Sequence, residues 1–171
     1  MDITSYIRTI PDFPKPGIMF KDITPLLGDP KAFALSIDLL AEKLSNIEYS
    51  AIVGIESRGF IFGAALAYKC GKKLVPVRKK NKLPAETFQV EYALEYGTDI
   101  LEIHKDSLNP HEKVIIIDDL FATGGTVNAV EKLIGYCGAH ISGVAFIIEL
   151  MFLNGRKNIS SNNVISLIQY N

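Results

Sequence analysis

The segment that decides the fold is Val114 to Thr126, which reads V-I-I-I-D-D-L-F-A-T-G-G-T. Its first four residues are β-branched and apolar, with neither helical spacing nor polar alternation, as expected for a strand buried on both faces of a parallel sheet. Two carboxylates, Asp118 and Asp119, follow the apolar run directly. The segment therefore predicts an α/β fold with a mostly parallel central sheet flanked by helices, and it places the chemistry at the carboxyl end of this strand.

The loop after the strand, T-G-G-T at residues 123–126, has the residue types that bind phosphate. Such a loop can fold backbone N–H groups around an anion and begin a helix beneath it. Because a carboxylate repels phosphate, we expect Asp118 and Asp119 to hold hydroxyls or a hydrated metal ion on the same ligand, and a sugar phosphate fits that arrangement. The alternative is a solvated strand end followed by a Thr-capped turn. A Walker A loop is excluded because no lysine follows the glycines.

The composition fits a single globular domain over residues 1–171, because 48% of the residues are hydrophobic and 22% are charged. A net charge of −1 gives no global electrostatic basis for binding nucleic acid or membrane. The start of the chain lacks the basic and apolar parts of a signal peptide, and no apolar run approaches ~18 residues, so we expect a cytoplasmic protein. Cys70 and Cys137 are isolated at the ends of apolar segments, which predicts packed thiols rather than a disulfide or a metal pair.

The other elements alternate in the βαβ manner, which favours a mostly parallel sheet covered on both faces. The patterns predict helices at residues 31–45, 60–69 and 125–137, and strands at residues 51–55, 74–78, 143–148 and 164–168.

Residues 79–98, which we call the lid, break this alternation. The segment begins with lysines, passes through alternating apolar and polar residues and ends near a glycine, so it predicts a long excursion or hairpin that leaves the core. Its basic start follows the carboxyl end of the strand at 74–78, the same sheet edge as the phosphate loop. This shared edge favours a lid that closes over an anion, and a solvated charged hairpin is the alternative.

Basic residues after two strand ends have a plausible common target. Arg58 follows the strand at 51–55, and Arg78, Lys79 and Lys82 come from the end of the next strand. Arginine forks and mobile lysine charges together suit a pyrophosphate. A second phosphate site, distinct from the T-G-G-T loop, implies a ligand such as 5-phosphoribosyl-1-pyrophosphate (PRPP). Its pyrophosphate travels with Mg²⁺, which keeps several waters, so we expect magnesium as the cofactor without direct protein ligands.

The N-terminal residues, about 1–30, form what we call the hood. Their stretch F-P-K-P-G-I-M-F-K-D-I-T-P-L-L at 13–27 contains three prolines and a glycine, so it predicts an extended cover rather than a regular helix. From chemistry alone, Phe20 could equally be a core residue. This stretch is followed in order by G-I-E-S-R-G-F, R-K-x-x-K-L-P, E-Y-x-L-E-Y-G and D-D-L-x-A-T-G-G-T. Over about residues 7–170, the chain resembles the adenine branch of the phosphoribosyltransferase family, which has the type I phosphoribosyltransferase fold.

The resemblance implies transfer of a phosphoribosyl group from PRPP to N9 of adenine, giving AMP and pyrophosphate in purine salvage, by a homodimer. It also implies that Phe20 stacks on the purine, with Met19 and Lys21 beside the base edge. By the same resemblance, pyrophosphate is bound by Arg58, Arg78, Lys79 and Lys82, and the ribose hydroxyls face Asp118 and Asp119. The 5′-phosphate is surrounded by Ala122, Thr123, Gly124, Gly125 and Thr126. Glu95 handles the proton at N7 of adenine. Two alternatives are a transferase for 6-oxopurines and a purine-sensing module without catalysis. Lys21 stands where arginine is common, and this difference could shift purine discrimination.

Overall fold

The computed structural model describes residues 1–93 and 97–171, and within these residues a seven-stranded sheet forms the centre, in the order β5-β6-β4-β3-β7-β8-β9. Five adjacent strands are parallel: β4 (Lys73–Lys79), β3 (Ala51–Ile55), β7 (Lys113–Phe121), β8 (His140–Leu150) and β9 (Val164–Tyr170). Strands β5 (Thr87–Ala93) and β6 (Thr98–His104) add an antiparallel hairpin at one edge. The mostly parallel sheet predicted from the sequence is confirmed.

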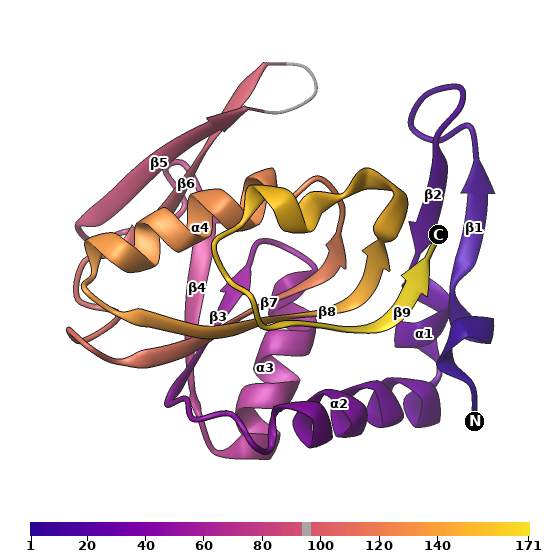
Figure 1. Cartoon of the computed structure of the whole chain (residues 1–171), viewed down its shortest axis with the longest axis horizontal. Helices are drawn as coiled ribbons and strands as arrows, with labels where there is room; N and C mark the ends of the chain where they lie inside the picture. The colour runs from indigo at the N-terminus through magenta and orange to yellow at the C-terminus, as the bar shows by residue number, and fades with distance from the viewer. Residues whose placement is uncertain (94–96) are drawn as a thin grey trace.

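Helices cover both faces of this sheet (Figure 1). Helices α2 (Pro30–Leu44) and α3 (Gly59–Cys70) lie on one face, and α4 (Gly125–Tyr136) lies on the other. In β7, Val114 and Ile116 join the core that contains α4, whereas Ile115 and Ile117 join the core that contains α2 and α3. Strand β7 shows no polar alternation because both of its faces are buried.

Strand β7 does not end where the apolar run ends, at Ile117. It continues through Asp118 and Asp119 to Phe121. Asp118 is paired with Phe146 of β8, and Phe121 is paired with Glu149. The ring of Phe121 also stacks on Phe146 at a centroid distance of 4.7 Å. The carboxylates are therefore held on a paired strand rather than on a loop.

The hood is a small two-stranded sheet beside β9 (Figure 1). Strand β1 (Arg8–Pro11) pairs antiparallel with β2 (Met19–Asp22), after the short helix η1 (Ile3–Tyr6) and before helix α1 (Thr24–Gly28). The prediction of an extended cover holds for β2 but was wrong for α1. Pro25 lies in the first turn of α1, where a helix needs no N–H donor from that residue, so this proline begins the helix instead of breaking it.

Asp22 holds β1, β2 and the start of α1 together within the hood. Its carboxylate accepts hydrogen bonds from the hydroxyl of Thr24 at 2.6 Å, the backbone N–H of Thr24 at 2.9 Å and the guanidinium of Arg8 at 2.6 Å. These donors, Thr24 first, lower the pKa of Asp22 to about 2. The buried side chain thus fixes the chain direction where β2 gives way to α1.

The prediction that the whole lid leaves the core was wrong for the base of the hairpin. Val90 of β5 and Leu101 of β6 are paired and buried in the core that contains α4. Strand β6 also pairs with β4, at Arg78↔Glu102 and Lys79↔Leu101. The alternating apolar residues of this segment face α4, so only the distal part of the hairpin projects from the body (Figure 1).

The chain ends with the short helices η2 (Met151–Leu153) and η3 (Gly155–Asn158), followed by β9. Cys137 is buried and Cys70 is half-buried, and both are free thiols, as predicted. Within residues 1–93 and 97–171, none of the helices combines the length and the apolarity that crossing a membrane requires.

Candidate active site

The carboxyl ends of β3, β4 and β7 meet at one edge of the sheet, where side chains enclose a pocket of about 550 Å³. The residues that line this pocket are Glu56, Ser57, Arg58, Lys79, Asp118 and Asp119. In open α/β sheets, ligands bind beyond the carboxyl ends of the strands. The pocket therefore lies where the sequence predicted the chemistry.

Arg58 links the carboxylate pair to the hood. Its Nε lies 2.9 Å from Oδ2 of Asp119, and its guanidinium carbon lies 5.6 Å from the centre of the Phe20 ring. The N–H of Arg58 is not directed at Oδ2, so the contact is an ion pair, and this buried oxygen accepts no hydrogen bond from the described residues. Asp119 is only 3% exposed. A buried carboxylate oxygen without a hydrogen-bond donor is costly unless water or a ligand supplies the donor.

The environment of Asp118 raises its pKa, which the sequence did not indicate. Burial raises the pKa of Asp118 well above its usual value, and the charge of Asp119 raises it further. Oδ1 of Asp118 accepts the backbone N–H of Asp119 at 2.8 Å. The chain also passes close by at Gly59, where an added Cβ would lie 2.9 Å from that same oxygen. Asp118 is therefore a confined carboxyl group that resists ionisation more strongly than an exposed aspartate.

The two basic residues at the end of β4, Arg78 and Lys79, each lie beside a carboxylate. The Nζ of Lys79 lies 3.0 Å from Oδ2 of Asp99, a contact that raises the pKa of Lys79, and the backbone N–H of Lys79 donates to Glu56 at 2.7 Å. The Nε of Arg78 lies 3.4 Å from the same carboxylate of Glu56. Sequence reasoning assigned no role to either acid. Glu56 lies within the quoted G-I-E-S-R-G-F motif, whereas Asp99 gave no signal in the sequence.

The loop at residues 122–126 begins α4 without a side-chain cap from the described residues, so the N–H groups at the start of the helix are open to an anion. Gly124 has a φ of 86°, a left-handed conformation that favours glycine. A second pocket, of about 420 Å³, lies between this loop and β5, and its lining includes Tyr92, Thr123 and Gly125. The predicted phosphate loop thus faces a cavity bordered by the hairpin.

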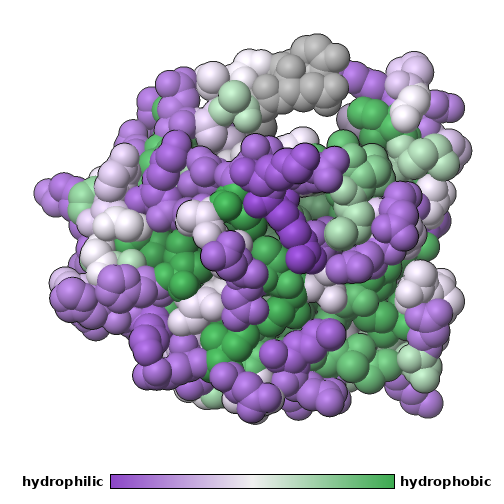
Figure 2. Space-filling model, in the orientation of Figure 1, coloured by the Kyte–Doolittle hydropathy of each residue, from purple (hydrophilic) through white to green (hydrophobic). Residues whose placement is uncertain are grey.

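The three hood residues point in different directions. Phe20 is half-buried and lies near Arg58, so it is not a core residue. The Nζ of Lys21 donates to the hydroxyl of Thr9 at 2.9 Å and lies 3.9 Å above the ring of Tyr170. Met19 is 54% exposed, and Figure 2 shows apolar surface over this part of the molecule. Phe20 thus lies beside Arg58, which lines the pocket, whereas the side chain of Lys21 is directed toward the C-terminal strand.

Comparisons with known proteins show the family to which the chain belongs. The family model described as phosphoribosyl transferase domain matches residues 24–165. An adenine phosphoribosyltransferase from Synechococcus sp. is 56% identical over 99% of both chains. The crystal structure of the adenine phosphoribosyltransferase from Thermoanaerobacter pseudethanolicus has a TM-score of 0.95 and 54% identity, covering 98% of both chains. The Saccharomyces cerevisiae enzyme, complexed with an imino-altritol bisphosphate and adenine, has a TM-score of 0.91 and 39% identity over 96% of both chains. The chain belongs to the adenine phosphoribosyltransferase family.

Within this adenine phosphoribosyltransferase fold, the structure brings Arg58, Lys79, Asp118 and Asp119 into one pocket. Lys82 is exposed, and its backbone oxygen accepts a 3.3 Å hydrogen bond from Arg78. Glu95 lies outside the described residues.

Proposed function

We propose that this chain catalyses the reaction of PRPP with adenine, which forms AMP and pyrophosphate and so salvages the purine. The observation on which this rests is Oδ2 of Asp119, a buried acceptor without a donor, in a pocket that also contains Arg58 and Lys79. A ribose hydroxyl supplies the missing donor, while the two cations suit the pyrophosphate on the same sugar. The match to full-length relatives named adenine phosphoribosyltransferase, one of them complexed with adenine, supports adenine as the acceptor.

In this proposal the charges are arranged for the transition state. Positive charge develops on the ribose ring as pyrophosphate leaves, so a carboxylate at the ribose stabilises the transition state more than the ground state. Asp119 is the better placed of the pair for this role, because the pKa of Asp118 is raised. Arg58, Arg78 and Lys79 neutralise the negative charge that the leaving pyrophosphate gains.

The remaining contacts position the other parts of the substrates. Residues 122–126 and the first turn of α4 hold the 5′-phosphate, and Phe20 stacks on adenine. We also propose that Lys82 reaches the pyrophosphate, that Met19 and Lys21 contact the base edge through their backbones, and that Glu95 handles the N7 proton. The hood and the distal lid exclude water, which would otherwise capture the activated ribose.

We propose Mg²⁺ as the cofactor, bound mainly through pyrophosphate, ribose hydroxyls and water. The pocket offers carboxylate oxygens from Glu56, Asp118 and Asp119, the oxygen donors that Mg²⁺ prefers. When bound, the ion neutralises charge on the departing pyrophosphate.

We also propose a cytoplasmic homodimer, with each chain as one domain. Helix α3 is apolar on nearly all sides, which is typical of a helix that is buried all round. Its outer face nevertheless exposes Ile61 and Tyr68, the latter at 91%. A second copy of the chain would cover this stripe. Light scattering of Tyr68→Asp tests the interface: a monomer is expected, and an unchanged dimer would exclude this face.

The proposed function is tested by incubating the protein with magnesium, PRPP and each of adenine, hypoxanthine and guanine. AMP should form from adenine in strong preference to the other two products. Preference for hypoxanthine or guanine would make the protein a 6-oxopurine transferase, and binding of purine without any product would make it a sensing module.

A further inference from the structure

The segment after β8 lies against the phosphate loop. We call residues 154–158 the brace. An added Cβ at Gly155 would overlap the carbonyl oxygen of Ala122, and one at Gly124 would lie 2.6 Å from the carbonyl oxygen of Gly155. The two backbones therefore approach as closely as two glycines allow, and a side chain at either position would push the brace and the loop apart.

Asn158 makes the polar contact between the brace and the loop. Its side-chain Nδ2 donates to the backbone carbonyl oxygen of Thr123 at 2.7 Å. Its backbone carbonyl oxygen accepts a hydrogen bond from Nδ2 of Asn128 at 2.9 Å. In a planar trans peptide the C=O and the following N–H point in opposite directions. Holding the carbonyl of Thr123 toward the brace therefore turns the N–H of Gly124 away from it, as a donor available to an anion.

The brace is itself held by a buried carboxylate. Glu149 of β8 is 2% exposed, and the Arg156 guanidinium donates to its two oxygens at 2.6 and 2.7 Å. Ser166 donates a third bond at 2.7 Å, and Gln169 lies at 3.4 Å. Arg156 has the largest effect in lowering the pKa of Glu149. A carboxylate this deeply buried is stable only when its oxygens are paired, so the position of Arg156 is closely determined.

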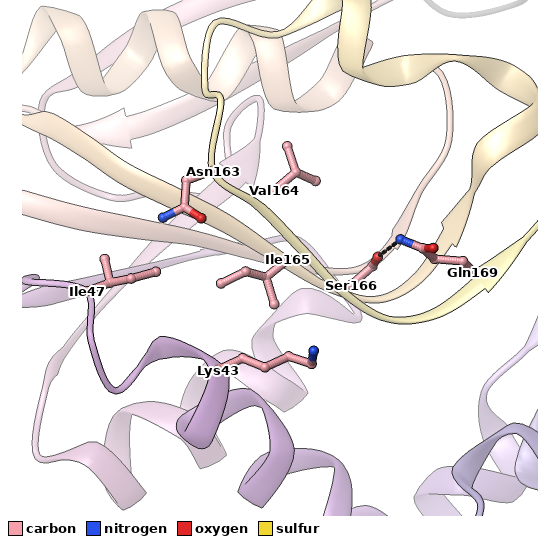
Figure 3. Close-up of a pocket in the computed structure, with 7 residues that line it drawn as sticks. All are labelled: Lys43, Ile47, Asn163, Val164, Ile165, Ser166 and Gln169. Atoms are coloured by element: carbon pink, nitrogen blue, oxygen red, sulfur yellow. Dashed lines mark hydrogen bonds between the residues drawn. The ribbon is translucent and has the colours of Figure 1, made fainter.

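Figure 3 shows Ser166 and Gln169 joined by a hydrogen bond on β9, in a groove of about 480 Å³ between β9 and the end of α2. Both side chains also reach Glu149, so the last strand contributes to holding the brace.

We infer that Glu149, Arg156 and Asn158 are positioning residues for the 5′-phosphate loop. The ion pair fixes the brace, and the brace orients the Thr123–Gly124 peptide and so the N–H donor that it contains. None of the three is assigned a contact with a reacting atom. The inference rests on the proposed function, because it assumes that residues 122–126 bind the 5′-phosphate.

The test compares two ligands that differ in this phosphate. AMP carries the 5′-phosphate, whereas inorganic pyrophosphate does not. Asn158→Ala removes the bond to Thr123 from an exposed side chain and leaves the buried pair intact. Arg156→Met removes the fork, and Arg156→Lys restores one charged donor. Lys73→Met is the matched control, because it removes a 2.9 Å ion pair with Glu112 far from the loop.

By calorimetry with magnesium, Asn158→Ala should weaken AMP binding by roughly five- to tenfold, the effect of one well-placed hydrogen bond. Pyrophosphate affinity should stay within about twofold, because no hydrogen bond to that ligand is lost. Arg156→Met should weaken AMP binding more, Arg156→Lys less than Arg156→Met, and the control not at all. The KM for PRPP should rise with little change in the KM for adenine.

Equal loss of AMP and pyrophosphate binding, or no loss of either, would overturn the inference. If Arg156→Met does not fold, Asn158→Ala decides alone. Failure of the wild-type protein to make AMP would instead overturn the proposed function.

Discussion

Replacing Asp118 and Asp119 separately by asparagine should change stability in opposite directions while reducing turnover in both cases. Both substitutions keep size and remove charge. In Asp118→Asn the new amide oxygen can still accept the 2.8 Å hydrogen bond from residue 119, and the ion pair between Arg58 and Asp119 remains. The variant therefore removes a buried charge that lies beside a like charge.

The sign of the stability change follows from the pKa of Asp118. When folding raises the pKa of a carboxyl group, that group stabilises the folded protein at pH values below its unfolded pKa of 3.8. This contribution is lost as the pH rises through the pKa of the folded state. At pH 7 the wild type therefore bears a cost that Asp118→Asn lacks. The unfolding free energy of the variant should be higher by on the order of 1–3 kcal/mol, the range for an uncompensated buried group. The difference should shrink as the pH falls toward 3.8.

Asp119→Asn should have the opposite effect on stability. It removes the carboxylate that lies 2.9 Å from Arg58. Because the Arg58 side chain is 42% exposed, the free energy of unfolding should fall by only about 1 kcal/mol. Each variant should lower kcat, and the double variant by about 10² to 10³, as for the loss of a preorganised electrostatic group. Urea unfolding at pH 7 and pH 4, with steady-state kinetics, measures both effects. A less stable Asp118→Asn variant, or an unchanged kcat in the double variant, would refute the reasoning.

Three further predictions follow from the hood and the lid. Phe20→Ala should raise the KM for adenine and leave that for PRPP nearly unchanged, because stacking on a base is worth ~1–3 kcal/mol; similar losses for both substrates would indicate a collapsed hood. Asp22→Asn should lower the unfolding free energy at pH 7 by up to about 2 kcal/mol, because a carboxylate with a lowered pKa stabilises the fold above its unfolded value. Urea titrations should show that difference disappear as the pH falls from 3.8 to about 2, and a difference independent of pH would argue against it. In hydrogen exchange, β7 and Val90 should be protected with and without ligand. The lid beyond Val90 should gain protection when magnesium and PRPP are added, both in the wild type and in the slower Glu95→Gln variant. If that part of the lid is already as protected as β7 before ligand is added, gating is excluded.

The sheet and the phosphate loop could be predicted because their signals are local. The apolar run Val114–Ile117 is contiguous, and a run without period in a βαβ pattern has few other structural solutions. The loop at 123–126 and the helix after it occupy one short segment, so backbone chemistry alone indicates an anion site there. Phe20 needed the resemblance, because an aromatic residue in an irregular segment is equally compatible with a core position.

The features that sequence reasoning missed depend on pairs distant along the chain. Nothing local connects Lys79 with Asp99, or indicates that the base of the lid packs on α4. Glu149 did leave a signal, since a glutamate within the apolar strand V-A-F-I-I-E-L must be paired if it is buried. Its partner Arg156 follows only from the turn that η2 and η3 make. The helix at 24–28 does not follow from the sequence pattern because proline usually breaks a helix, although in a first turn it favours one.

The pairing of the basic residues has a consequence for catalysis under the proposed function. Arg58 lies beside Asp119, Arg78 beside Glu56, and Lys79 beside Asp99. Pyrophosphate that binds these cations therefore replaces carboxylates instead of meeting free charges. The exchange makes the net gain on binding smaller than the number of contacts suggests, because each new ion pair forms as another one is lost. The same exchange runs in reverse when the product leaves, since the carboxylates regain their partners as pyrophosphate dissociates. The carboxylates that weaken the binding of PRPP thus also keep the enzyme from binding pyrophosphate too tightly.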